Sequence, residues 1–300
     1  MVGCPPNPMR LSIEDHDRDS AQLVYVYPVL SRRAGGVSVG INLNPNNACN
    51  WRCVYCQVPD LVPGMAPDID LARLESELAG FLRRVVHGDY LAKHVPEGMP
   101  EGSRVLKDVA FSGNGEPTGS KQFAEVVERV GKVMKELELA GTIQLVLITN
   151  GSLMHHAHVQ RGLTAMKDLG GVVWFKVDSA TDAGQALLND AKAGVARTRA
   201  NVEIAARICP TWIQTMMVGW KGERATHAQG LPSEPEQDAY LAFLRDLVAK
   251  RVPVQGVLLY GLARRSYQPE AKELFALPRK WMESFARRIE ETGLAVQLNL

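Results

Sequence analysis

Two periodicities of apolar residues alternate along the chain. Unbroken or alternating apolar runs are typical of buried strands, whereas apolar residues that recur about every 3.6 positions are typical of helices with one buried face. The strand-like runs cover residues 37–44, 105–112, 143–148, 172–177, 212–218 and 254–260. The helix-like segments lie near residues 71–85, 123–137, 153–169, 182–207, 241–248 and 281–289. A shorter run at 23–27 predicts one additional strand.

This alternation of strand and helix predicts a parallel sheet covered by helices. Parallel neighbours need long crossovers, and strands that are buried on both faces are apolar along their whole length. The repeated units fit an open doubly wound sheet or an incomplete (β/α)6 barrel, and the pattern alone leaves both open. Residues 1–36 are interpreted as an N-terminal arm and lead-in, because residues 1–20 are polar and contain prolines. Residues 37–300 are expected to form one domain, since no repeat or linker divides them.

The composition is that of an ordinary globular chain, with 46% hydrophobic and 22% charged residues among 300. The 34 basic and 33 acidic side chains give a formal net charge of +1. This balance neither suggests nor excludes a nucleic-acid partner, which needs only a local basic face. Residues 1–8 lack the pattern of a secretory signal, and no apolar run approaches the roughly 18 residues that span a membrane. We therefore expect a cytoplasmic protein without a membrane partner.

Three of the five cysteines stand together, as Cys49, Cys53 and Cys56, directly after the first long strand-like run. Clustered cysteines in a chain without a secretory signal favour metal binding over disulfides. A four-iron cluster held by three local thiolates keeps one iron without a protein ligand, and that iron is open for chemistry. A structural zinc site, which normally has a fourth Cys or His, and a chance grouping of buried cysteines remain as alternatives. Cys4 and Cys209 are expected to be unreactive bystanders.

The segments that follow the apolar runs carry the other candidate site residues. In parallel α/β folds, ligands bind beyond the carboxyl ends of the strands, so these segments are the informative ones. The second run is followed by two glycines and a carboxylate, the third by small polar residues, and the fourth run ends in two charges. Tight turns and a structural ion pair are the alternatives to ligand binding. The residues concerned are Gly113, Asn114, Gly115, Glu116 and Pro117, then Thr149 and Asn150, then Lys176 and Asp178.

The three cysteines and the turn at residues 113–117 together resemble the radical S-adenosylmethionine (SAM) superfamily. The resemblance implies a partial, TIM-like (β/α)6 barrel in which the loop with the cysteines follows the first strand. It also implies that Cys49, Cys53 and Cys56 hold a [4Fe–4S] cluster and that SAM binds the fourth iron. Reductive cleavage of SAM would then yield a 5′-deoxyadenosyl radical that abstracts hydrogen from a substrate. An electron donor such as a flavodoxin or a ferredoxin is an implied partner.

The resemblance also assigns SAM contacts to the strand ends. The turn is similar to the family's Gly-Gly-Glu-Pro motif, although Asn114 stands where many members have the second glycine. The implied contacts are Gly113, Asn114, Gly115, Glu116 and Pro117 for the methionine amino group, Thr149 and Asn150 for the methionine end, Lys176 and Asp178 for the ribose and carboxylate, and Tyr55, Gly261 and Leu262 for the adenine.

A narrower resemblance concerns the substrate. Residues 31–33, 37–45 and 112–118 look like a bacterial branch grouped with wyosine-type tRNA-modifying radical SAM proteins. Residues 57–59 depart from the archaeal and eukaryotic tRNA enzymes, and the sequence has no second cysteine cluster. The resemblance of the first three segments makes transfer RNA one expected substrate. The alternatives are radical modification of a peptide or partner protein, and a non-catalytic iron–sulfur or zinc module. The candidate phosphate contacts are Arg32, Arg33, Arg264 and Arg265.

Overall fold

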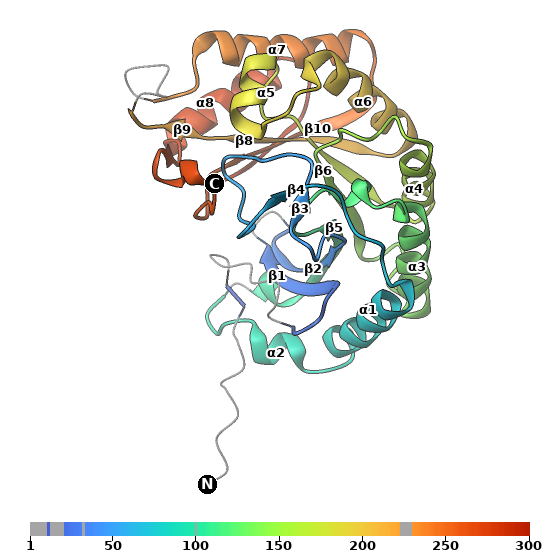
Figure 1. Ribbon diagram of the computed structural model, residues 1–300. Coiled ribbons are helices and arrows are strands. Elements are labelled where there is room, and N and C mark those ends of the chain that lie inside the picture. Colours follow the sequence, from blue (N-terminus) through green and yellow to red (C-terminus); the bar gives the residue numbers. More distant parts are fainter. Residues whose placement is uncertain (1–10, 13–20, 32–33, 100, 223–229) are drawn as a thin grey trace.

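The computed structural model describes residues 11–12, 21–31, 34–99, 101–222 and 230–300. Its centre is a curled eight-stranded sheet with helices along the outer, convex face, which together form a half-barrel (Figure 1). In sheet order the strands are β1 (Val26–Ser31), β2 (Gly36–Asn42), β5 (Leu106–Ser112), β6 (Gln144–Thr149), β7 (Val172–Lys176), β8 (Thr211–Met217), β10 (Val254–Gly261) and β12 (Val296–Asn299). β1 is antiparallel to β2, and the other neighbours are parallel. The expected partial TIM-like barrel is confirmed.

The helices follow the predicted apolar stripes. In α1 (Leu71–Val86) the apolar residues of one face are buried, and Asp70 caps the helix by accepting a hydrogen bond from the backbone N–H of Arg73. The remaining helices are α2 (Tyr90–His94), α3 (Phe123–Glu136), α4 (Ala157–Asp168), α5 (Asp182–Asn189), α6 (Gly194–Ile208), α7 (Glu234–Ala249) and α8 (Arg279–Glu290), with 3₁₀ turns η1 (Glu101–Arg104), η2 (Pro117–Gly119) and η4 (Pro269–Lys272).

The two edge strands differ from the sequence prediction. The additional N-terminal strand begins at Val26, because the backbone N–H groups of Val24 and Tyr25 donate to the carboxylate of Glu77 in α1 instead of to a strand. β12 is absent from the predicted strands because its alternating apolar and polar run is only four residues long, and these residues are only partly buried. β12 nevertheless pairs with β10 and extends the parallel part of the sheet.

The segment with the three cysteines lies across the concave side of the sheet (Figure 1). This cysteine loop (residues 43–61) leaves the end of β2 and contains β3 (Ala48–Cys49), which pairs with β4 (Val62–Pro63). A second short pair, β9 (Gly219–Trp220) with β11 (Leu274–Phe275), lies beyond the end of β8. Both short pairs therefore add to the rim of the half-barrel, where the candidate site residues lie.

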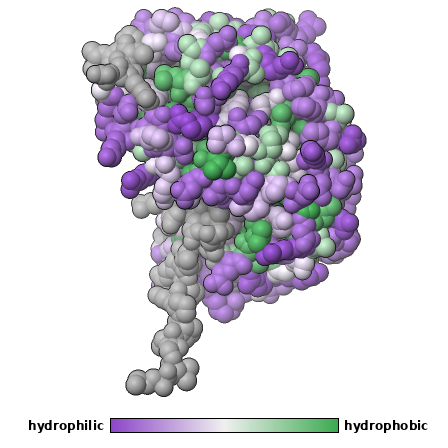
Figure 2. Space-filling model, viewed as in Figure 1, coloured by the Kyte–Doolittle hydropathy of each residue, from purple (hydrophilic) through white to green (hydrophobic). Residues whose placement is uncertain are grey.

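The main core fills the space between the sheet and the outer helices. Phe111 and Phe123 meet edge to face there, with ring centroids 5.7 Å apart, and Phe175 is equally buried. The face of the molecule seen in Figure 2 is mostly hydrophilic, with small, separate apolar areas. Within the described residues, no helix has the length and apolar character needed to cross a membrane.

Candidate active site

A cavity of about 280 Å³ lies between the cysteine loop and the concave face of the sheet. Three predicted site residues lie beside it and do not line it. Pro117 is buried at the start of η2, Asp178 is buried behind Lys176, and Leu262 packs against the apolar cluster that contains Tyr55. The predicted residues that line the cavity are Cys49, Cys53, Tyr55, Cys56, Gly113, Asn114, Gly115, Glu116, Thr149, Asn150, Lys176 and Gly261.

Two neighbouring segments fix the position of the cysteine loop. On one side, the backbone N–H of Val54 donates to the carbonyl of Leu188 in α5 (2.9 Å). On the other side, the hydroxyl of Ser266 donates to the carbonyl of Val54 (2.7 Å). Arg52 forms a bidentate ion pair with the buried carboxylate of Glu270, with 2.8 Å from Nη1 to Oε2 and 2.9 Å from Nη2 to Oε1. The loop is therefore held both by α5, which follows β7, and by the segment that follows β10.

The three cysteine thiols fit a cluster bound through thiolates. Burial raises the pKa of Cys49 to about 12 and that of Cys53 to about 11, but a thiol bound to metal is deprotonated outright. N–H groups already point at two of the sulfurs. The backbone of Trp51 donates to Cys49 Sγ (3.5 Å), and the side chain of Asn189 donates to Cys53 Sγ (3.3 Å). Such hydrogen bonds stabilise a thiolate and are typical of iron–sulfur sites.

The three sulfurs do not converge on one point. In the described part of the chain, no three or more His, Cys, Asp or Glu side chains are arranged to hold a single metal ion. A [4Fe–4S] cluster takes each thiolate on a different iron, so it does not require such convergence.

The turn after β5 packs directly against the cysteine loop. A Cβ atom at Gly115 would lie only 2.1 Å from the carbonyl oxygen of Ala48, so no other residue fits there without moving the loop. Asn42, at the end of β2, joins the two segments. Its side-chain oxygen accepts hydrogen bonds from the backbone N–H groups of Asn44 (3.0 Å) and Asn114 (3.1 Å).

Glu116 is a buried carboxylate whose orientation is fixed by four hydrogen bonds. Its oxygens accept from the backbone and hydroxyl of Thr118 (3.1 and 2.6 Å), from the Thr149 hydroxyl (2.6 Å) and from the Asn150 backbone (2.6 Å). Burial raises the pKa of Glu116, and these donors oppose that effect. The Asn150 side chain continues to the cysteine loop, where it donates to Asn50 (2.8 Å). The ends of β5 and β6 are thereby joined to the loop.

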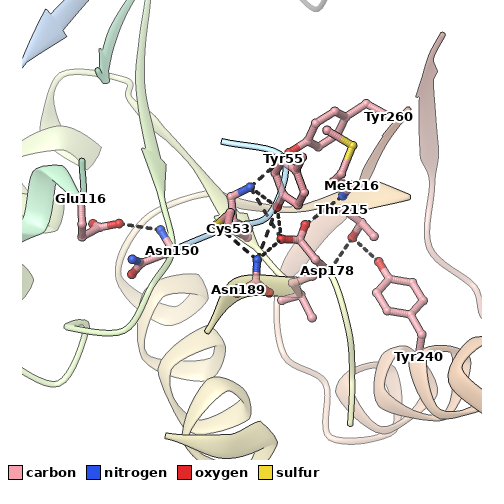
Figure 3. A network of polar contacts seen from close by, with 12 residues as sticks. Cys53, Tyr55, Glu116, Asn150, Asp178, Asn189, Thr215, Met216, Tyr240 and Tyr260 are labelled. Carbon is pink, nitrogen blue, oxygen red and sulfur yellow. Dashed lines mark hydrogen bonds and ion pairs between the residues drawn. The ribbon is translucent and has the colours of Figure 1, made fainter. Parts of the chain in front are cut away.

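Tyr55 and Asp178 lie beside Cys53 in a buried polar network (Figure 3), and Lys176 belongs to the same network. The Tyr55 hydroxyl donates to Asp178 and accepts from Lys176 Nζ (2.6 Å), which also donates to the Tyr260 hydroxyl (3.3 Å). The ion pair between Lys176 and Asp178 is present, with 3.6 Å between Nζ and Oδ2. Burial lowers the pKa of Lys176. The negative charge of Asp178, together with weaker interactions with Tyr260 and Cys53, outweighs this effect and raises the pKa above its ordinary value. Lys176 thus presents a fixed positive charge to the cavity.

The basic residues predicted to contact phosphate are only partly placed. Arg264 lines the cavity, whereas Arg265 is exposed and does not line it. Arg32 and Arg33 lie outside the described residues.

Sequence reasoning missed several residues that the fold brings to the site. Asn50 and Asn189 carry no local signal, because their contacts depend on how distant segments meet. Gln214 did carry a signal, since it is a polar residue inside the apolar run of β8. Tyr260 is the one aromatic residue of β10, and the sequence pattern predicts it only as part of a strand.

Comparisons with known proteins agree with this geometry. A model of the radical SAM superfamily matches residues 43–231. A UPF0026 protein of Helicobacter pylori is 27% identical over 137 residues, and the GTPase Obg of Brachyspira hyodysenteriae is 26% identical over 136 residues. Each match covers 45% of this chain but only 37% and 17% of the respective relative.

Solved structures share the fold at low sequence identity. A radical SAM methyltransferase from Sphaerobacter thermophilus is 11% identical, with a TM-score of 0.56 over 91% of this chain and 68% of that chain. TYW1 with a lysine–pyruvate adduct bound is 12% identical, with a TM-score of 0.51 over 86% of this chain and 74% of that chain. At such identities the likeness shows the fold alone.

Proposed function

The chain belongs to the radical SAM superfamily, and on this basis we propose that it cleaves SAM reductively and uses the resulting 5′-deoxyadenosyl radical to modify a substrate. The observation that carries this proposal is that three cysteines of one loop line the same cavity as Glu116 and Lys176. A [4Fe–4S] cluster bound there would supply the electron for SAM cleavage. A flavodoxin or a ferredoxin would in turn be the electron donor.

Cys49, Cys53 and Cys56 would hold the cluster, and two fixed charges would orient SAM. Glu116 presents a carboxylate whose direction is set by its four donors, and it complements the ammonium group of the methionine part. Lys176 presents a positive charge, held by Tyr55 and Asp178, which complements the SAM carboxylate.

The other proposed SAM contacts follow the same division along the cavity. Residues beside the carboxylate would bind the methionine end, and those near the aromatic side of the cavity would enclose the adenine. The methionine contacts on the cavity wall are Gly113, Asn114, Gly115, Thr149 and Asn150, and the adenine contacts there are Tyr55 and Gly261, whereas Pro117 and Leu262 lie beside the cavity.

We infer transfer RNA as the substrate from the resemblance of residues 31–33, 37–45 and 112–118 to the wyosine-type branch. Arg264, on the cavity wall, is the described residue that supports a phosphate contact. The lysine–pyruvate adduct of TYW1 is not carried over to Lys176, because a lysine must be neutral to attack a carbonyl and Lys176 is ion-paired with Asp178. Radical modification of a peptide or partner protein is the alternative substrate class.

Iron and sulfide content tests the proposal before any substrate is known. Protein purified without oxygen should show the broad visible absorption of an iron–sulfur cluster, and each of Cys49→Ala, Cys53→Ala and Cys56→Ala should lose most of it. Cys209→Ala is the matched control, because Cys209 is a buried free cysteine that does not line the cavity. Colourless protein with stoichiometric zinc would instead favour a non-catalytic zinc module.

A further inference from the structure

Gln214 is a buried amide with unused hydrogen-bonding capacity. It lies in the middle of β8 and only 1% of its surface is exposed. Among the described residues, neither its amide nitrogen nor its amide oxygen has a hydrogen-bond partner. Buried polar groups are almost always paired, because leaving one unpaired is costly. An amide that is unpaired at both atoms therefore needs a reason outside the folding of the chain.

The cavity supplies that reason. Gln214 is one of the residues that line it, and its side chain is on the same face of the sheet as Lys176, beside the space where the cluster and SAM would bind. In the parallel register Gln214 is opposite Lys176 of β7, and Trp174 lies two residues before Lys176 on the same face. Trp174 lines the cavity as well. The concave face of the sheet thus places a donor, an acceptor and an aromatic ring around one space.

The shape of the amide discriminates between ligand classes. A glutamine amide presents its N–H and its C=O side by side in one plane, so one ligand group can engage both only if it also has a donor beside an acceptor. The edges of nucleobases have this arrangement, and Gln pairs with them through two hydrogen bonds. A trans peptide bond directs its N–H and C=O to opposite sides, so it can engage only one of the two atoms.

We propose that Gln214 and Trp174 form a nucleobase site, in which Gln214 pairs with the edge of an unstacked base and Trp174 contacts its face. Proteins that read single nucleotides combine stacking on aromatic rings with hydrogen bonds to base edges. The site rests on the proposed function and makes it more specific, because it places a base of the substrate within the cavity that holds the radical chemistry. It favours a nucleic-acid substrate over a peptide.

Nucleoside binding to the full-length protein tests this site. Adenosine, guanosine, cytidine and uridine, with N-acetylglycinamide as the peptide probe, are titrated by calorimetry in the presence and absence of SAM. At least one nucleoside should bind the wild type, and Gln214→Met should weaken that binding about 5- to 150-fold, the range of a two-bond contact to a base. Gln185→Met is the matched control. Gln185 is equally buried, but its amide is bonded to Ser179 and Thr198 outside the cavity.

Thermal unfolding of the same variants separates a binding role from a structural one. Gln214→Met, and Gln214→Leu as a second variant, should unfold at the same or a higher temperature than the wild type, because they remove an unpaired buried amide. Gln185→Met should unfold at a lower temperature, because its amide is paired.

Three results would overturn the site: no nucleoside binds the wild type, Gln214→Met binds as tightly as the wild type, or N-acetylglycinamide binds more tightly than every nucleoside. The proposed function fails separately. Wild type that binds a nucleoside through Gln214 but never acquires iron would keep the base site and remove the radical chemistry. Wild type that acquires the cluster but binds no nucleoside would keep the radical chemistry and remove the base site.

Discussion

Asp178→Asn is expected to destabilise the protein, because it breaks a buried charge pair. The Asp178 carboxylate accepts hydrogen bonds from the Tyr55 hydroxyl, from the Asn189 side chain (2.8 Å) and from the Met216 backbone (2.9 Å). The Lys176 ammonium is 3.6 Å away, and the two side chains are 15% (Lys176) and 0% (Asp178) exposed. The substitution keeps the shape of the side chain but removes the charge that compensates this ammonium.

The cost follows from the charge that remains. Removing one partner of a buried ion pair typically lowers the free energy of unfolding by about 3–5 kcal/mol, a large part of the roughly 5–15 kcal/mol that stabilises a domain. Lys176→Met should cost a similar amount, because it leaves the Asp178 carboxylate without its cation. In the double variant neither charge is left alone. The two costs should therefore fall short of additivity, by about 0.5–3 kcal/mol.

Urea unfolding of iron-free protein, followed by circular dichroism, measures the free energies of unfolding of the wild type, both single variants and the double variant. Asp89→Asn and Lys93→Met provide a matched control, because that pair is 2.6 Å apart but lies in the solvent, with both side chains more than 60% exposed. Its substitutions should cost little and show little coupling. Additive costs for Asp178→Asn and Lys176→Met, or costs no greater than those of the control pair, would refute the reasoning.

Three further predictions concern the turn, its carboxylate and the cavity mouth. A Cβ at Gly115 would lie 2.1 Å from a carbonyl oxygen of the cysteine loop, so Gly115→Ala should lower the iron content per chain. Gly80→Ala, where an added Cβ meets no atom within 4 Å, should leave the iron content unchanged. Equal iron contents in Gly115→Ala and Gly80→Ala would contradict the close packing at Gly115. Burial raises the pKa of Glu116 above its ordinary value of 4.5, so the folded state binds this proton more tightly than the unfolded state does. The resulting contribution to the free energy of unfolding is complete below about pH 4.5 and is lost as pH rises through the folded-state pKa. Urea unfolding between pH 4 and 8 should show that Glu116→Gln does not lose this stability as pH rises. The same pH dependence of the free energy of unfolding in the wild type and in Glu116→Gln would refute this prediction. If Arg264 and Arg265 bind phosphates, replacing each with Ala should reduce the logarithmic salt slope of transfer RNA binding by about 0.7–0.9, and an unchanged slope would exclude both.

The sequence predicts most of the fold because each central parallel strand is a nearly continuous apolar run. Such a run is recognisable without knowledge of its neighbours. The edge strands are not, because their pairing depends on partners elsewhere in the chain. β12 is stabilised by its register with β10, and the start of β1 is set by the side chain of Glu77.

The candidate site is predictable where residues follow strands and unpredictable where segments meet. Glu116 and Lys176 lie at or just beyond strand ends, so parallel topology alone places them on one rim. The contact of Asn189 with Cys53 depends on where α5 ends relative to the cysteine loop. The polar character of Gln214 is visible in the sequence, but only the structure shows that its amide is unpaired and that the residue lines the cavity.

Release of 5′-deoxyadenosine from SAM is the most direct test of the proposed radical chemistry. Protein reconstituted with iron and sulfide without oxygen is mixed with SAM and dithionite, and the product is measured by mass spectrometry. We expect slow release by the wild type and by Cys209→Ala, whose thiol is buried against the Gly171 carbonyl, and only background release by Cys53→Ala. Release by Cys53→Ala equal to that of the wild type, or no release by any of the three proteins, would contradict the claim that these cysteines hold a cluster that cleaves SAM.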